Sequence, residues 1–255
     1  MKICLFANRD LASQLALAYL IKGLDQHHLS IFISETVGNS SHYVDALKEL
    51  SQFEKTAMNS LTMDFDQLAE TVGCKLQGFS DLNNRINATE GVARISDCDP
   101  DLIISVRFGL IIDQPIISLP RFGVLNLHSG ILPQYRGVMA TFRAMLKGDS
   151  HIGSTLHYIS DRGVDTGDII SIEKIPINPE CSYLLNVLHL YPRGCDQVLR
   201  AVNAIDTMQP LLSRPQQGRP SYYSFPNNQE IEQFMALGYR LFDPTELQLI
   251  KDLQP

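Results

Sequence analysis

The sequence predicts an α/β fold: a Rossmann-like, mostly parallel sheet with helices on both faces and a short C-terminal extension. Two observations support this prediction. Apolar runs of strand length alternate with segments of helical periodicity along the first two thirds of the 255-residue chain, the arrangement typical of parallel strands joined by helices. With 44% hydrophobic and 19% charged residues, the chain can also bury a full core.

The first half alternates strands with helices. We expect strands at Ile3 to Ala7, Leu29 to Ile33 and Leu102 to Val106, a short one at Lys75 to Phe79, and helices at about Leu11 to Ile21, His42 to Glu54 and Phe65 to Val72. Gly23 is the stop signal of the first helix. Leu102 to Val106 is the clearest central strand because it follows the Asp99-Pro100-Asp101 turn.

The second half continues this alternation of strands and helices up to Pro210, after which the predicted structure is mostly extended. We expect strands at Gly123 to Asn126, Gly153 to Ile159 and Ile169 to Ile175, and a helix at Ser182 to Ile205 that Pro192 and Gly194 kink or split. After Pro210 the chain is extended, with short helices at about Asn228 to Leu237 and Thr245 to Leu253, for which Asn227 and Asp243 are plausible starts. We therefore predict a catalytic domain at 1–205 and a C-terminal extension at 206–255 that packs on it.

Composition and charge limit the class of protein. The net charge of −7 argues against a general affinity for nucleic acid. The five cysteines include no C-x-x-C pair, so we expect reduced thiols and a cytoplasmic protein. No apolar run is long enough for a signal peptide or a membrane span, so we expect no membrane association.

Ligands of parallel sheets bind beyond the carboxyl ends of the strands. That rule directs attention to three loops, which begin at Asn8, Arg107 and His128. The loop that follows the first strand has no Gly-x-Gly-x-x-Gly turn, which argues against an ordinary dinucleotide-dependent enzyme.

Asn126, His128 and Asp165 form a set that can move an acyl group without a nucleophilic side chain. An amide donor and an imidazolium would stabilise the oxyanion of a tetrahedral intermediate, and Asp165 would hold His128 protonated and relay protons through water. A lone Asn-x-His is more often a turn with a satisfied histidine, and Asp165 alone could be a turn aspartate. His157, Asp161 and Asp168 are weaker candidates that we interpret as structural, and no His, Cys and Asp spacing suggests a metal site.

The flanking segments resemble the formyltransferases that use 10-formyltetrahydrofolate. The resemblance rests on Asn126-Leu127-His128, Ile131-Leu132-Pro133, Tyr135-Arg136-Gly137, Gly153-Ser154-Thr155-Leu156-His157 and Val164-Asp165-Thr166-Gly167-Asp168, with Phe108 to Ile112 upstream at the spacing of methionyl-tRNA formyltransferases. It covers about residues 100 to 175, in several segments in the correct order.

The resemblance implies a folate-dependent formyltransferase with 10-formyltetrahydrofolate as co-substrate and no metal. Asn126, His128 and Asp165 would be its catalytic residues. The folate would contact Phe108, Gly109, Leu110 and Ile111 on one segment and Asp161, Arg162, Gly163 and Val164 on the other.

Two segments depart from the family pattern. Ser129-Gly130 stands where the family usually has Gly-Ser or Pro-Ser, a change that conserves size and turn formation. Phe6 to Asp10 lacks the glycine-rich turn that glycinamide ribonucleotide enzymes use around their substrate phosphate. We therefore do not expect that acceptor.

The acceptor is predicted from the C-terminal part. Only about fifty residues follow Ile205, without a basic run, whereas methionyl-tRNA formyltransferases carry a further barrel that helps to hold the tRNA. This favours a small-molecule amine, in particular the amino group of a nucleotide-linked sugar. Arg9, beside Asn8, would meet the diphosphate, and Tyr222 and Tyr223 would stack on the base.

Several alternatives remain open. The tract from Tyr222 to Phe225 could instead be an edge strand that pins the tail to the core. Hydroxyornithine or methionyl-tRNA could be the acceptor, or the protein could bind folate without turnover. The C-terminal elements could form a homodimer surface or cap the monomer.

Overall fold

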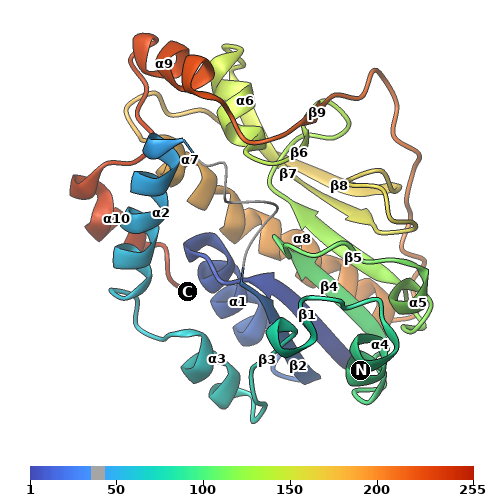
Figure 1. The fold of residues 1–255 in the computed structure, drawn as a ribbon. Coiled ribbons are helices and arrows are strands. Elements are labelled where there is room, and N and C mark those ends of the chain that lie inside the picture. The colour runs from blue at the N-terminus through green and yellow to red at the C-terminus, as the bar shows by residue number, and fades with distance from the viewer. Residues whose placement is uncertain (36–43) are drawn as a thin grey trace.

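A seven-stranded sheet forms the centre of the protein, in the order β3-β2-β1-β4-β5-β7-β8 (Figure 1). The structure is a computed structural model, and it describes residues 1–35 and 44–255. The strands are β1 (Lys2–Asn8), β2 (His28–Ser34), β3 (Gln77–Gly78), β4 (Leu102–Val106), β5 (Val124–His128), β7 (His151–Tyr158) and β8 (Ile169–Pro176). The first five are parallel, and β7 and β8 are antiparallel to their neighbours. The predicted fold class is confirmed.

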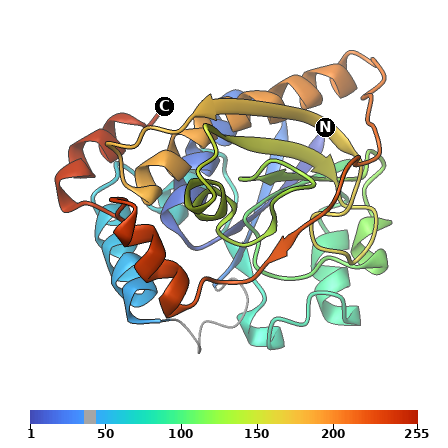
Figure 2. The same ribbon diagram turned by 90° about the horizontal axis from the view of Figure 1, so that it is seen from above.

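Helices cover both faces of this sheet, as Figure 2 shows from above. They are α1 (Leu11–Gly23), α2 (Asp45–Met58), α3 (Phe65–Thr71), α4 (Thr89–Ser96), α5 (Gln114–Ile117), α6 (Ala140–Leu146), α7 (Tyr183–Leu188), α8 (Leu190–Asp206), α9 (Asn228–Ala236) and α10 (Leu247–Asp252). Short 3₁₀ turns lie at Ser80–Leu82 and Pro244–Glu246.

The two faces of the sheet bury two separate apolar clusters because successive strand residues point to opposite sides. In β1, Ile3 and Leu5 pack on the face that α1, α7 and α8 cover, and Cys4 and Phe6 pack on the other face, with α4 and α5. Strands buried on both faces are therefore apolar throughout, which is why β1 and β4 stand out in the sequence.

The predicted helix at Ser182 to Ile205 is two helices. The break falls at His189, between α7 and α8, and not at the proline. Pro192 lies in the first turn of α8, where its missing N–H leaves no hydrogen bond unmade. Gly194 packs against Leu127, where an added Cβ would lie 3.1 Å from that side chain.

Other predicted boundaries shift by a few residues. The helix expected from His42 begins at Asp45, and His42 itself lies outside the described residues. The short strand expected at Lys75 to Phe79 contains only Gln77 and Gly78. The sequence did not indicate α4, α5 or α6, which are short and follow loops.

The tail after α8 crosses the molecule and rejoins the same core (Figure 2). It bridges to β8 at Arg214, pairs as β9 (Tyr222–Tyr223) with β6 (Arg136–Gly137), and places α9 beside α6. Phe234 of α9 stacks on Phe142 of α6 with ring centroids 4.5 Å apart. The predicted division into 1–205 and 206–255 stays a prediction.

Two findings bear on the setting of the protein. All five cysteines are free thiols, as the sequence predicted. Across residues 1–35 and 44–255, no helix is long and apolar enough to cross a membrane. The cytoplasmic location stays a prediction.

Replacement of Phe234 by alanine should lower the free energy of unfolding of the whole protein by about 3 to 5 kcal/mol, because the ring is fully buried in the main core. Met235→Ala, a change at the exposed neighbouring position, should stay within about 0.5 kcal/mol of the parent. Denaturant unfolding followed by circular dichroism measures both. A separate early transition in Phe234→Ala, with the main transition unchanged, would show that the tail unfolds on its own.

Candidate active site

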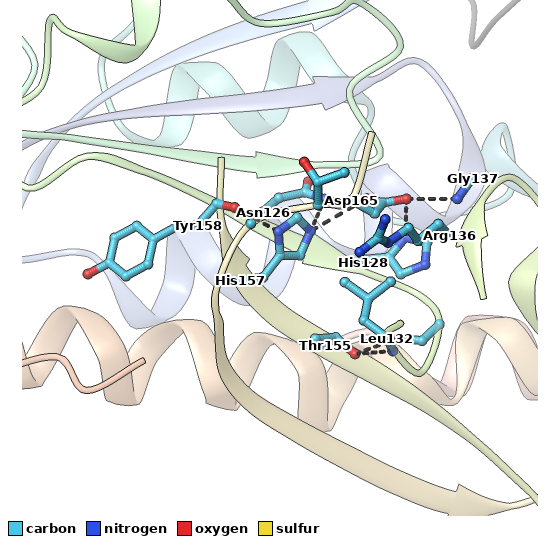
Figure 3. Close-up of polar contacts among 12 residues, drawn as sticks. Asn126, His128, Leu132, Arg136, Gly137, Thr155, His157, Tyr158 and Asp165 are labelled. Carbon is cyan, nitrogen blue, oxygen red and sulfur yellow. Dashed lines mark hydrogen bonds and ion pairs between the residues drawn. The ribbon is translucent and has the colours of Figure 1, made fainter. Parts of the chain in front are cut away.

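The predicted catalytic side chains meet at the carboxyl end of β5. Asn126 and His128 lie two residues apart on this strand, so they point to the same face. The antiparallel pairing of β5 with β7 sets Asn126 opposite His157. Asp165 lies on the loop that joins β7 to β8, and Figure 3 shows that its side chain points toward the β5 residues. The structure therefore brings Asn126, His128 and Asp165 together.

The Asp165 carboxylate is almost fully buried and is contacted from several directions. The backbone N–H of Gly137 donates to Oδ2 at 2.8 Å, and His128 Nδ1 lies 3.5 Å from the same oxygen. Oδ1 faces His157 Nε2 at 3.5 Å and accepts from Asn126 Nδ2 at 3.4 Å. Each carboxylate oxygen thus has one imidazole and one N–H donor as neighbours (Figure 3).

These neighbours keep Asp165 ionised. Burial is the largest single influence and would raise the pKa of its carboxyl group, but His128, His157 and the Gly137 N–H act in the opposite direction and together outweigh it. The pKa falls from 3.8 to about 2. A fixed negative charge therefore stands beside His128 at neutral pH.

His128 is oriented by a backbone carbonyl. Its Nε2 lies 2.7 Å from the Tyr135 oxygen, and because a carbonyl can only accept, Nε2 carries the hydrogen of this bond. Nδ1 is then the ring nitrogen that faces Asp165 and is open to gain or lose a proton. Gly130 leaves room for this arrangement, since a Cβ there would lie 2.5 Å from Nε2. The structure thus accommodates Ser129-Gly130, the pair that differs from the usual Gly-Ser or Pro-Ser of the family.

His157 is the residue whose position the sequence interpretation underestimated. Its Nδ1 bonds the Tyr158 carbonyl oxygen at 2.8 Å and therefore carries a hydrogen, which leaves Nε2 to accept from Asn126 Nδ2 at 3.0 Å. His157 thereby fixes the orientation of the Asn126 amide. The available signal was its place within the Gly153 to His157 segment, but its contact with Asn126 depends on the register of β7 against β5.

Gln216 in the tail also supports the site, and the sequence did not indicate it. Its Nε2 donates to the carbonyl oxygens of Asp165 and Gly167, at 2.8 Å each, and its Oε1 accepts from Arg136. Asp165 has a φ of 54°, in the left-handed region, so its loop needs such support. Gly167 is required because a Cβ there would collide with the Tyr158 carbonyl oxygen.

The two segments predicted to bind folate lie next to each other. Phe108 packs on Phe6 with centroids 4.9 Å apart, and the Gly109 N–H donates to Ser34 Oγ. Gln114 at the start of α5 donates to the Ser160 carbonyl oxygen, which ties this segment to the loop from Asp161 to Val164.

Apolar side chains on both segments remain open to a ligand. Ile111 is 47% exposed and Val164 is 36% exposed, while Leu110 is half-buried. Asp161 accepts from the Gly163 N–H and from Thr166 and so shapes its own loop. Arg162 is exposed on that loop.

The residues predicted to bind the acceptor differ in availability. Asn8 is buried, with its amide bonded to Asp10 and Ser34. Arg9 pairs with Glu35 at 3.0 Å and lies over the ring of Phe65. Both have partners within the protein, and their role toward a substrate stays a prediction.

The two tyrosines of β9 have different surroundings. Tyr223 is stacked on Tyr135, and its hydroxyl accepts a hydrogen bond from Lys147. Tyr222 is 64% exposed. Its backbone pairs with Arg136, and its ring lies next to Gly137, whose N–H bonds Asp165. The strand pairing of β9 with β6 agrees with the edge-strand alternative. Tyr222 is the tyrosine of the pair whose ring stays open to solvent.

Together these groups can stabilise an oxyanion and move protons. The site combines an ionised carboxylate, two imidazoles and an amide. In the described residues, no group of three or more His, Cys, Asp or Glu side chains could hold a metal ion.

Comparison with known sequences gives one family. A family model described as Formyl transferase matches residues 27–184. A methionyl-tRNA formyltransferase from Hydrogenovibrio crunogenus is 35% identical over 126 residues, which are 49% of this chain and 39% of that protein. The chain spans less than half the length of the first curated relatives that it matches.

Solved structures share the fold at low sequence identity. WlaRD, a sugar 3N-formyl transferase crystallised with dTDP and 5-N-formyl-THF, aligns with a TM-score of 0.57 and 18% identity, over 88% of this chain and 69% of the other. A glycinamide ribonucleotide transformylase from Symbiobacterium toebii aligns with a TM-score of 0.60 and 14% identity, over 84% and 93%.

The low pKa of Asp165 should make stability depend on pH. A carboxyl group with a depressed folded-state pKa stabilises the protein above its unfolded pKa of 3.8, and this contribution disappears as pH falls through about 2. Between pH 7 and pH 2 the wild type should therefore lose about 2 kcal/mol more unfolding free energy than Asp165→Asn.

Denaturant titrations at several pH values provide the measurement. Asp168→Asn, which changes an exposed carboxylate three residues away, is the matched control. Its unfolding free energy should change with pH as that of the wild type does. Equal pH slopes for Asp165→Asn and the wild type would contradict an ionised, paired Asp165.

Proposed function

The chain belongs to the formyl transferase family, and on that premise we propose that it transfers a formyl group from 10-formyltetrahydrofolate to a primary amine. The observation that supports this most strongly is the buried, ionised Asp165 facing Nδ1 of His128 at 3.5 Å, with the Asn126 amide alongside. This set supplies charge stabilisation and proton transfer at one point, which is what acyl transfer to an amine requires.

In the proposed reaction the amine nitrogen bonds to the formyl carbon and the bond from that carbon to folate N10 breaks. The amine loses one proton and N10 gains one. His128 Nδ1 would accept and return this proton, and the negative charge of Asp165 would stabilise the imidazolium between the two steps.

Asn126 would stabilise the charge that develops on the formyl oxygen. One N–H of its amide is directed to His157 Nε2 at 3.0 Å, and the other makes the longer, 3.4 Å contact with Asp165. The longer contact is the weaker one. That N–H is therefore the donor that would turn to the formyl oxygen, while the bond to His157 keeps the amide in place.

10-Formyltetrahydrofolate would supply the activated formyl group as co-substrate. The structure offers a fitting surface in the exposed side chains of Ile111 and Val164, on two segments that the Gln114 to Ser160 hydrogen bond ties together. Apolar side chains flanking a polar site suit a flat heteroaromatic ring. Phe108 to Ile111 and Asp161 to Val164 would form its walls.

The acceptor that we propose is the amino group of a nucleotide-linked amino sugar. Support comes from the exposed ring of Tyr222, which lies on the strand that pairs with Gly137 next to Asp165. An exposed tyrosine beside a catalytic carboxylate suits stacking on a base. WlaRD, which shares the fold, is itself a sugar 3N-formyl transferase crystallised with dTDP.

Methionyl-tRNA is the second candidate acceptor. Curated relatives at 30 to 40% identity are methionyl-tRNA formyltransferases, over matches of 90 to 146 residues. The net charge of −7 is unfavourable for tRNA binding unless basic residues cluster locally. This candidate therefore belongs in the same assay as the sugars.

Replacement of Asn126 by alanine should lower kcat by roughly 100- to 1000-fold, the effect of removing one oxyanion donor in other acyl-transfer enzymes. Asp168→Asn should retain wild-type turnover, since this exposed carboxylate lies outside the proposed machinery. Circular dichroism establishes that both variants are folded. Wild-type turnover in Asn126→Ala would contradict the role of the amide.

The acceptor is identified by tetrahydrofolate release with a panel of amines. We expect release with a nucleotide-linked amino sugar and not with hydroxyornithine or methionyl-tRNA. Turnover with either of the latter alone would overturn the sugar assignment and leave formyl transfer intact. Folate binding without release for any acceptor would instead indicate a binding protein without turnover.

A further inference from the structure

A cluster of charged side chains lies beside the proposed catalytic residues, at the ends of β1 and β4. The sheet register pairs Val106 with both Ala7 and Leu127, so the next residue, Arg107, stands between the loops that begin at Asn8 and His128. Arg107 has a φ of 57°, a left-handed conformation that is unfavourable for a side chain of this kind. An observed backbone outlier of this type is a reason to ask what the side chain does.

The Arg107 side chain is held from one edge only. Its Nε donates to both carboxylate oxygens of Asp10, at 3.1 and 2.9 Å, and Asp10 is itself fixed by the Asn8 amide and the Ser13 N–H. In the described part of the chain, neither Nη group of Arg107 has a hydrogen-bond acceptor or an ion-pair partner. The four N–H donors of the two Nη groups therefore remain open, on a side chain that is 25% exposed.

A buried hydroxyl without a partner lies next to this fork. Tyr191 in α8 is 1% exposed, and its Oη lies beside the Arg107 guanidinium and the Ser129 side chain. No group in residues 1–35 and 44–255 makes a hydrogen bond of normal geometry with that oxygen, and Arg107 and Ser129 make only longer polar contacts with it. A buried polar group left unpaired costs stability, so such groups call for an explanation.

A second carboxyl group lies across from Arg107. Glu54 in α2 is close enough for its charge to interact with those of Arg107 and Asp10, but in the described structure no ion pair within 4.0 Å joins it to Arg107. Burial and the charge of Asp10 raise the pKa of Glu54 to about 7, although Arg107 lowers it. A raised pKa lessens the negative charge that Glu54 places near the Arg107 guanidinium.

The charge of Asp10 does not cancel that of Arg107 for a ligand. Asp10 caps α1, where its carboxylate accepts the Ser13 N–H and interacts favourably with the positive end of the helix. Its bonds to Arg107 involve Nε alone and leave both Nη groups without a bond to this carboxylate. A guanidinium fork presented in this way matches the paired oxygens of a carboxylate or a phosphate.

We propose that Arg107 and Tyr191 bind an anionic oxygen group, a phosphate or a carboxylate, on the amine-bearing acceptor. This inference rests on the proposed formyl transfer and adds a specificity determinant to it. The position supports it, because Ser129, which Tyr191 lies beside, directly follows His128. The single ion pair of Arg9 in the described residues is with Glu35 and uses its Nε, whereas the Nη groups of Arg107 have no ion-pair partner there and the Tyr191 hydroxyl has no hydrogen-bond partner.

The decisive variants are Arg107→Gln and Tyr191→Phe, each assayed with an anionic acceptor and with the same amine lacking the anion. The pairs are a nucleotide-linked amino sugar with its free sugar, and hydroxyornithine with its decarboxylated amine. Arg107→Gln should raise KM for the anionic acceptor on the order of 100-fold with little change in kcat. With the neutral amine, kcat/KM should change by less than about threefold, since no charged contact is lost.

Tyr191→Phe distinguishes an effect on acceptor binding from an effect on protein stability. It removes a hydroxyl that has no partner in the free protein, so Tm should stay unchanged or rise, while KM for the anionic acceptor rises about tenfold. Arg200→Gln, which removes an exposed charge paired with Glu173, is the control and should leave KM unchanged. An equal loss with anionic and neutral acceptors in both variants would overturn the proposal.

Direct binding keeps this test independent of turnover. Isothermal titration calorimetry with inorganic pyrophosphate and with acetate should show that the wild type binds one of them and that Arg107→Gln does not. Preference for pyrophosphate indicates a phosphate-bearing acceptor, and preference for acetate a carboxylate. Equal binding of both probes to the wild type and Arg107→Gln would overturn the site even if formyl transfer is observed. Loss of probe binding with no turnover for any amine would support the site and count against the proposed reaction.

Discussion

The geometry of the site depends on the burial of one negative charge, that of the Asp165 carboxylate. A buried carboxylate is tolerated only where charges and hydrogen-bond donors surround it. Here the partners come from β5, from β7 and from the segment after β5: His128 and Asn126, His157, and the Gly137 N–H. Satisfying Asp165 therefore requires that these segments be in register. The same contacts fix the imidazole and amide that the proposed chemistry uses.

The C-terminal tail takes part in meeting this requirement. Gln216 bonds the backbone on both sides of Asp165 in its left-handed turn, and β9 holds β6, which presents the Gly137 N–H. The tail also enters the main core through Phe234. A segment that composition marks as an extension thus supports the position of the carboxylate. Its role is to shape the site as well as to cover the surface.

Features encoded locally could be predicted from the sequence. The buried strand β1, the Asn227 cap of α9, and the shared direction of Asn126 and His128 all follow from short-range patterns. The contact between His157 and Asn126 could not be predicted, because it depends on an antiparallel register between segments about thirty residues apart. The break at His189 was missed for a related reason: a proline is tolerated in a first helical turn, so it did not mark the boundary. The Arg107 cluster draws on a loop, α1, α2 and α8, and no single segment signals it.

Asp165 and Arg107 both adopt left-handed conformations near His128, and their surroundings differ. The free-energy cost of the left-handed conformation at Asp165, with a φ of 54°, is offset within the protein. Both carboxylate oxygens and the carbonyl oxygen of this residue accept hydrogen bonds. The cost at Arg107, with a φ of 57°, is offset only along the Nε edge. A glycine would adopt either conformation more easily, but it would supply no side chain. The unbonded part of Arg107 and the unpaired Tyr191 hydroxyl are therefore the places where binding of an acceptor would still add stability.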